Sequence, residues 1–100
     1  MSRTLAFHPA AREELLAAVD RYEQLRPGLG AAFLAAVQSA AQHALEWPET
    51  GGPLGRELRR IFVRRFPYYL LYALERDQLY AVAVGHFRRH PRYWADRQDA

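Results

Sequence analysis

The chain has 100 residues, of which half are hydrophobic and a quarter are charged, and it contains no cysteine. A chain of this length builds one modest core, so we expect a single domain over residues 1–100. The lack of cysteine excludes a disulfide framework and a thiolate zinc site. No basic-then-apolar leader opens the chain, and the uncharged stretch Gly30–Leu45 is shorter than the roughly 20 residues of a membrane span. We therefore expect a cytoplasmic protein.

All 14 basic residues are arginine, and they are unevenly distributed. Residues 1–50 carry four arginines against six acids, whereas residues 51–100 carry ten arginines against five acids. The guanidinium group is a permanently charged, planar fork that suits carboxylates and phosphates. The basic second half therefore predicts an anionic partner, either nucleic acid or an acidic protein segment. An arginine-rich genome that fills a solvated surface would explain why arginine is used in place of lysine. It explains less well why the arginines are concentrated in the second half.

The first half of the chain predicts one short strand and two helices. Arg3–His8 alternates loosely as a strand does. A helix should follow from Pro9 to about Arg26, because proline suits a first helical turn and Pro27 disfavours helix in the residue before it. Glu13 and Glu14 would complement the positive end of this helix. A second helix to Leu45 would complete an antiparallel hairpin.

The second half changes to the two-residue period of strands. Trp47–Pro53 is dense in proline and glycine and predicts a loop. Strands are expected from about Glu57 to Phe66, where Pro67 would end or bend the chain, and then over Tyr68–Leu74 and Leu79–Phe87. Glu75–Gln78 has hairpin-turn length, Gly85 favours a bulge or a bend, and Pro91–Ala100 favours a short helix.

The predicted order is β-α-α-β-β-β, which defines the fold class α+β. We expect an antiparallel sheet with the helical hairpin packed on one face. The other face would be uncovered, and a ligand groove could lie there.

The chain resembles the ParE/RelE superfamily of toxins from type II toxin–antitoxin systems. The resemblance rests on the element order, on the Phe-Pro-Tyr…Tyr string beginning at Phe66, and above all on Val84-Gly-His-Phe-Arg-Arg-His-Pro-Arg-Tyr-Trp94. It implies a RelE/ParE-like fold and a hetero-oligomer with a cognate acidic antitoxin whose C-terminal segment wraps over the toxin. It implies one of two activities: the RelE-like branch cleaves mRNA on the ribosome without metal, and the ParE-like branch poisons DNA gyrase.

The segment after the last strand holds the side chains best suited to such a role. Arg88, Arg89 and Arg92 could neutralise phosphate or hold an acidic antitoxin, although they could also form a solvated basic loop. His86 could be a general acid or base, but a lone histidine at a strand end is more often structural. Tyr93 could stack on a base or donate a proton, or it could fold back with Trp94 and cap the core. No histidine has a second ligand at metal-site spacing, so we expect no metal.

The sequence departs from the nuclease pattern at Tyr69 and Phe87, where RelE-like nucleases carry basic residues, and lysine is absent. The departure favours a ParE-like toxin that inhibits gyrase, arrests growth, needs no cofactor and is not an enzyme. The alternatives are a ribosome-dependent mRNA endonuclease and an inactive module that only binds its antitoxin. The catalytic candidates, should RNA be cut, are Arg65, His86, Arg89 and Tyr93. The candidates for binding the target or the antitoxin are Arg59, Arg65, Tyr69, Phe87, Arg88, Arg89, Arg92, Tyr93 and Trp94.

Overall fold

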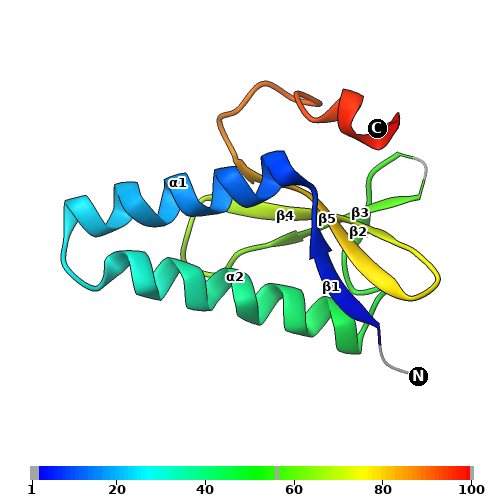
Figure 1. Cartoon of the computed structure of the whole chain (residues 1–100), viewed down its shortest axis with the longest axis horizontal. Helices are drawn as coiled ribbons and strands as arrows, with labels where there is room; N and C mark the ends of the chain where they lie inside the picture. Colours follow the sequence, from blue (N-terminus) through cyan, green and yellow to red (C-terminus); the bar gives the residue numbers. More distant parts are fainter. Residues whose placement is uncertain (1–2, 56, 100) are drawn as a thin grey trace.

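Five strands form one sheet in the order β1-β5-β4-β3-β2, with two helices on one of its faces (Figure 1). A computed structural model describes residues 3–55 and 57–99 of the chain. The elements are β1 Thr4–Phe7, α1 Pro9–Leu25, α2 Leu29–Glu46, β2 Gly52–Pro53, β3 Leu58–Phe62, β4 Tyr68–Leu74, β5 Gln78–His86 and the 3₁₀ helix η1 Ala95–Asp99. The α+β class and the helical hairpin are confirmed. The predicted tail helix is η1, and Ala100 lies outside the described residues.

The sheet is antiparallel except at β1, which pairs with β5 in parallel. The three antiparallel contacts join strands that follow one another in the chain, where short connections enforce reversal. By contrast, β1 and β5 are separated by most of the sequence, so no turn fixes their direction. The prediction of a wholly antiparallel sheet was wrong at this edge.

Side chains accept backbone N–H groups at two points of the helical hairpin, the start of α1 and the connection between α1 and α2. The ring nitrogen Nδ1 of His8 accepts the Ala10 N–H at 3.0 Å, which caps the start of α1. The Glu23 carboxylate accepts the N–H groups of Gly28 and Gly30 at 3.0 Å, where α1 passes into α2. Free helix-start N–H groups need such acceptors, so His8 has a structural role at the start of α1.

The core between the helices and the sheet is built on aromatic side chains. Phe33 of α2 lies 4.8 Å from the Tyr68 ring and 5.1 Å from the Phe66 ring, in edge-to-face arrangements. Tyr22 of α1 packs on the same group. Such ring pairs add roughly 0.5–1.5 kcal/mol each beyond their buried area. The α1–α2 hairpin and the middle of the sheet are therefore held as one unit.

The β3–β4 turn corrects the predicted strand boundary. We predicted a strand to Phe66, but β3 ends at Phe62 and the chain then turns, with Arg65 in the left-handed region at φ 75°. Val63 and Phe66 are both buried against the helices. Three residues apart on a strand, they would face opposite sides of the sheet. Burying both apolar side chains on one side therefore requires the turn.

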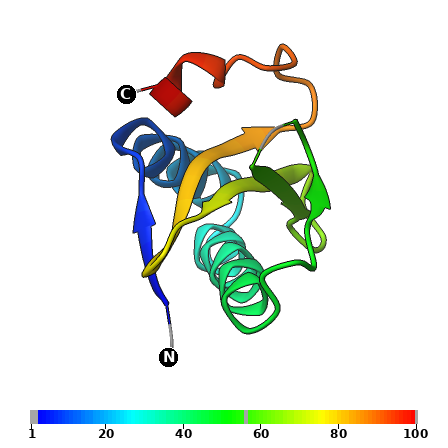
Figure 2. The ribbon, with the colours of Figure 1, turned by 90° about the vertical axis from the view of Figure 1, so that its right-hand side faces the viewer.

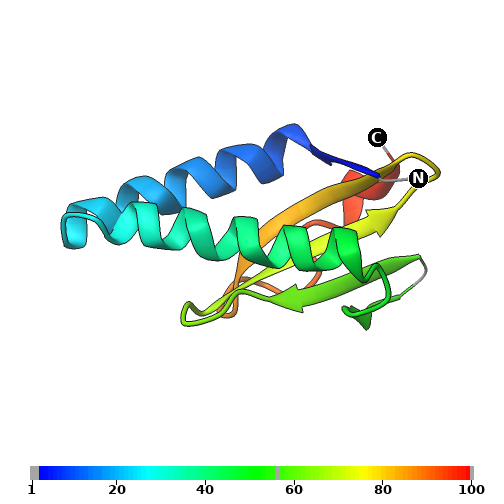
Figure 3. The same cartoon turned by 90° about the horizontal axis from the view of Figure 1, so that it is seen from below.

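The face of the sheet away from the helices is partly covered, which contradicts the predicted open face. Trp94 is only 4% exposed and packs with Tyr69, Leu71 and Val82. Figure 3 shows both helices in front of the sheet and the C-terminal segment behind it, and Figure 2 shows that segment beside the end of β5. The Trp94 side chain therefore packs into the core on this face, as one of our two interpretations predicted.

The predicted loop after α2 contains β2, which pairs with β3 through Gly52 and Pro53. Tyr72 holds this segment, because its hydroxyl donates to the Pro48 carbonyl and accepts the Gly51 N–H, both at 3.0 Å. Arg59 adds hydrogen bonds to the Gly51 carbonyl at 2.7 Å and the Glu49 carbonyl at 3.2 Å.

None of the described helices is long and apolar enough to cross a membrane.

Candidate functional site

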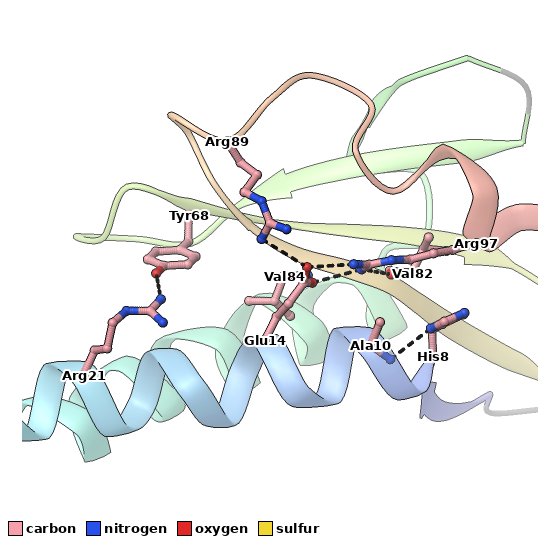
Figure 4. A network of polar contacts seen from close by, with 9 residues as sticks. All are labelled: His8, Ala10, Glu14, Arg21, Tyr68, Val82, Val84, Arg89 and Arg97. Atoms are coloured by element: carbon pink, nitrogen blue, oxygen red, sulfur yellow. Dashed lines mark hydrogen bonds and ion pairs between the residues drawn. The ribbon is translucent and has the colours of Figure 1, made fainter.

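The strand β5 extends beyond the end of β1, and side chains complete its hydrogen bonding there (Figure 4). Pairing with the β1 side ends where the His8 N–H donates to the Ala81 carbonyl at 2.8 Å. Further along, the Val84 N–H donates to Glu14 Oε1 at 3.0 Å, and Arg97 Nη1 donates to the Val82 carbonyl at 3.1 Å. A side chain from α1 and one from η1 thus take the place of a neighbouring strand.

Glu14 and Arg97 also bond each other in a two-pronged ion pair, with distances of 3.0 and 2.9 Å. Both side chains are 13% exposed. The bond from Glu14 raises the pKa of Arg97, which favours the charged form of the guanidinium. Arg89 lies 3.7 Å from the same carboxylate and is 53% exposed. One carboxylate therefore meets two cations, and Arg89 keeps most of its capacity to bind another anion.

These groups line a hollow of about 480 Å³ between α1 and the end of β5. Arg21 reaches into it from α1 and donates to the Tyr68 hydroxyl at 2.7 Å. The lining is predominantly polar or charged and comprises Ala10, Glu13, Glu14, Ala17, Arg21, Tyr68, Val84, His86, Arg89 and Arg97. The hollow can hold a small anion or an acidic side chain, since Arg89 and Arg21 offer donors.

His86 lies at the end of β5 with its ring against Tyr68, 5.1 Å between centroids. Its Nδ1 accepts the Arg88 N–H at 3.0 Å. The neutral ring therefore carries its proton on Nε2, and its free lone pair is already used. The structural role that the sequence favoured for His86 is consistent with this hydrogen bond.

The Tyr93 hydroxyl is buried and makes no hydrogen bond among the described residues. Burial raises the pKa of Tyr93 above its usual value, and the neighbouring Glu14 raises it further. The ring lies under Arg89, whose guanidinium carbon is 4.0 Å from the ring centroid. Its position depends on Gly85, because a Cβ at Gly85 would lie 3.0 Å from the Tyr93 hydroxyl and 2.6 Å from the Tyr69 ring. We predicted a bulge or a bend at Gly85; Gly85 is paired with Tyr69, and the register shift between β4 and β5 lies at Leu71 and Tyr72 instead.

The remaining predicted residues divide into buried and exposed groups. Tyr69 is buried in the covered face. Arg65 is exposed in the β3–β4 turn and lines a different hollow, between α2 and β3. Phe87 and Arg88 are exposed directly after β5. Arg92 is exposed and lies over the Trp94 ring, 5.8 Å from its centroid.

Sequence reasoning missed three residues of this region. Glu14 was read only as a partner of the helix start, and Arg97 and Phe62 were given no role. Phe62 is 56% exposed and its ring meets that of Phe87 at 5.4 Å. The pairing of Glu14 with Arg97 spans 83 residues and left no local signal. Within residues 3–55 and 57–99, no three His, Asp or Glu side chains are grouped to hold a metal ion.

The sequence matches, over residues 5–91, the family described as the ParE toxin of the type II toxin–antitoxin system parDE. The chain belongs to the ParE toxin family. The toxin also resembles a solved chain from the chromosomal ParDE system of P. aeruginosa, with a TM-score of 0.73, 15% identity, and coverage of 85% of the toxin and 96% of that chain.

A second solved structure, a double arginine-to-alanine mutant of the E. coli toxin RelE in the free state, is also similar. Its TM-score is 0.66 at 18% identity, with 99% of the toxin and 93% of that chain covered. At these identities, both likenesses concern the fold. A search of curated proteins found no match. The family predicted from the C-terminal string is thus confirmed, and the protein is a type II toxin.

Proposed function

We propose that the toxin arrests growth by binding and inhibiting DNA gyrase, in the cytoplasm, and that it is not a ribonuclease. The observation that carries the proposal is that the four catalytic candidates do not form one accessible set, although His86 and Arg89 line the same hollow. Metal-free RNA cleavage needs a base for the 2′-hydroxyl, cations for the phosphorane and an acid for the leaving oxygen. The Tyr93 hydroxyl is buried, and Arg65 lines another hollow.

The two remaining candidates, His86 and Arg89, cannot supply the base, the cations and the acid that RNA cleavage needs. The Nδ1 atom of His86 accepts the Arg88 N–H, so this nitrogen is poorly placed to take a proton from a substrate. Arg89 is a permanent cation and can stabilise charge but cannot exchange protons near neutral pH. Loss of even one charge-stabilising donor typically costs about 10²–10³ in rate. Of the four catalytic candidates, Arg89 alone can stabilise charge in this hollow, and this supports a toxin that acts by binding.

The exposed residues after β5 suit a binding role. Phe87, Arg88 and Arg89 are exposed on consecutive positions, and Arg92 follows after a short interval. They combine an apolar anchor with permanent positive charge, which is typical of contact residues in protein interfaces. We propose that this segment, together with the neighbouring β3–β4 turn, contacts gyrase.

We propose that a cognate acidic antitoxin neutralises the toxin as a hetero-oligomer. The surplus of cations around Glu14 supports this, because Arg89 can accept a second carboxylate. A disordered antitoxin segment can fold on such a surface and cover a large area. Added salt should weaken the complex only in part, since apolar contacts persist when charges are screened.

The test compares both targets with the same purified toxin. Gyrase is incubated with relaxed plasmid, and programmed ribosomes are incubated with mRNA. We expect loss of supercoiling and intact mRNA. Discrete cuts in the ribosomal A site with normal supercoiling would instead establish the RelE-like alternative. Failure of both assays, with an acidic antitoxin recovered from the native host, would identify an inactive antitoxin-binding module.

A further inference from the structure

The chain contains two long segments without any acidic residue. Residues 58–74 and 78–95 carry seven arginines and no Asp or Glu. They form β3, β4, β5 and the segment that follows β5. The acids Glu75 and Asp77 lie in the β4–β5 connection, at the opposite end of β4 from the β3–β4 turn. Among the described residues of these two segments, arginine is therefore the only charged type near that turn, and the one carboxylate that meets them there, Glu14, comes from α1 and contacts Arg89.

Aromatic rings lie between these arginines on the face away from the helices. Phe62, Tyr69 and Gly85 are in register across β3, β4 and β5. The guanidinium of Arg60 lies 5.2 Å from the Phe62 ring centroid and 5.5 Å from that of Tyr69. The Phe87 ring lies edge-on to Phe62 at 5.4 Å, and the Phe87 N–H donates to the Pro67 carbonyl, which anchors it beside the turn.

The same alternation continues on the other side of Gly85. Tyr93 packs there and lies under Arg89, 4.0 Å from the guanidinium carbon to the ring centroid. We call the set Phe62, Phe87, Arg60, Tyr69, Tyr93 and Arg89 the arginine–aromatic row. Phe62 is 56% exposed and Phe87 is 52% exposed, so both rings are accessible to a partner.

We propose that the arginine–aromatic row binds single-stranded DNA, with bases stacking on Phe62 and Phe87 and phosphates held by the surrounding arginines. Each nucleotide supplies a flat ring and a negative charge, which is what a row of alternating rings and guanidinium groups can bind. An acidic peptide supplies either a charge or an apolar group at each residue, so it matches the alternation less well. This inference goes beyond gyrase inhibition, because the contact is with DNA itself.

The experiment measures fluorescence anisotropy of a labelled (dT)20 oligonucleotide with the full-length toxin at low and moderate salt. Binding should weaken as salt rises, since phosphate contacts release counterions. Phe62→Ala and Phe87→Ala should each weaken binding about tenfold, the size typical of one lost stacking contact. Phe87→Tyr keeps the ring and should retain the affinity.

Matched controls separate stacking from general changes in surface or folding. Leu16→Ala and Leu25→Ala truncate exposed apolar side chains on the helical hairpin and should leave the affinity unchanged. Arg64→Gln, beside the row, should weaken binding and flatten the salt dependence, whereas Arg76→Gln, in the β4–β5 connection, should do neither. Circular dichroism verifies that each variant is folded.

Several outcomes would overturn the inference. The first is an absence of binding at low salt. The second is an equal loss of affinity in the phenylalanine and the leucine variants. The third is binding of (rU)20 that is at least tenfold tighter than that of (dT)20, which would indicate an RNA site. Competition by an acidic peptide that depends equally on Phe62 and Phe87 would indicate a protein site. A toxin that inhibits supercoiling without binding the oligonucleotide would refute this inference and leave the proposed function standing.

Discussion

Glu14 of α1 and Arg97 of η1, 83 residues apart in the sequence, form a two-pronged ion pair at 3.0 and 2.9 Å. The same two side chains bond the Val84 N–H and the Val82 carbonyl of β5. Helix α1 therefore meets β5 and η1, both from the far end of the chain, at one largely buried contact. The C-terminal segment that carries Tyr93 and Trp94 is anchored by it.

Removal of Arg97 should destabilise the protein far more than removal of Arg89. Arg97→Ala leaves the largely buried Glu14 carboxylate without its partner, which should lower the free energy of unfolding by about 3 kcal/mol. Arg89→Ala removes an exposed contact at 3.7 Å and should change it by less than about 0.5 kcal/mol. Urea unfolding followed by circular dichroism measures both. Equal losses would show that the pair is not the anchor.

Replacing Tyr93 with phenylalanine should stabilise the protein at neutral pH. The change removes a buried hydroxyl that has no hydrogen-bond partner, so we expect a gain of about 1 kcal/mol. Tyr72→Phe is the matched control, because its buried hydroxyl bonds Pro48 and Gly51. That substitution should cost about 2 kcal/mol, since it leaves both backbone groups unpaired. Thermal melts of the two variants should shift in opposite directions.

Stability should also fall in alkali, partly because of Tyr93. Burial raises the pKa of Tyr93 in the folded protein above the usual value of 10.0. Above pH 10 the unfolded chain loses this proton first, so stability that is fully present below pH 10 is lost as the pH rises toward the folded pKa. The wild type should lose about 1.4 kcal/mol more per pH unit than Tyr93→Phe. Parallel curves of unfolding free energy against pH would contradict this.

Gly85→Ala should loosen the C-terminal segment. The new Cβ would lie 2.6 Å from the Tyr69 ring and 3.0 Å from the Tyr93 hydroxyl, so the rings must move. Overpacking of this kind typically costs about 1–3 kcal/mol. Gly52→Ala is the control, because nothing lies within 4 Å of its Cβ. Faster amide exchange around Trp94 in Gly85→Ala alone would support the expectation, and similar exchange in both variants would refute it.

Toxicity should depend on the exposed arginines after β5. Arg88→Ala with Arg89→Ala should abolish growth arrest and leave the fold intact, since exposed side chains contribute little to stability. Arg12→Ala with Arg76→Ala removes the same charge elsewhere and should leave toxicity unchanged. Glu23→Ala is unsuitable as a control, because the Glu23 carboxylate accepts the N–H groups of Gly28 and Gly30. Full growth arrest by the first double variant at equal expression would refute the assignment.

The sequence by itself determined the elements and the family. The β-rich run Tyr68–Leu74 and the proline and glycine residues between the helices are local signals, and such signals were enough to predict the two helices and this strand. The element order, together with the string beginning at Phe66 and the string ending at Trp94, predicted the family, which the match over residues 5–91 confirms. Sequence periodicity failed to predict the end of β3. Val63 and Phe66 are both buried on the helix side of the sheet, and the turn between them is imposed by that packing.

Only the tertiary structure decided which candidate side chains are accessible. Tyr93 and Arg89 are near neighbours in sequence, yet the first has a buried hydroxyl and the second is half exposed. The difference arises because Gly85 admits the Tyr93 ring and Glu14 binds Arg97 in preference to Arg89. Glu14 is remote in the chain from both residues, and Gly85 belongs to β5 and acts together with Tyr69 of β4. Burial and ion pairing depend on such long-range contacts, and a sequence pattern carries only the near ones.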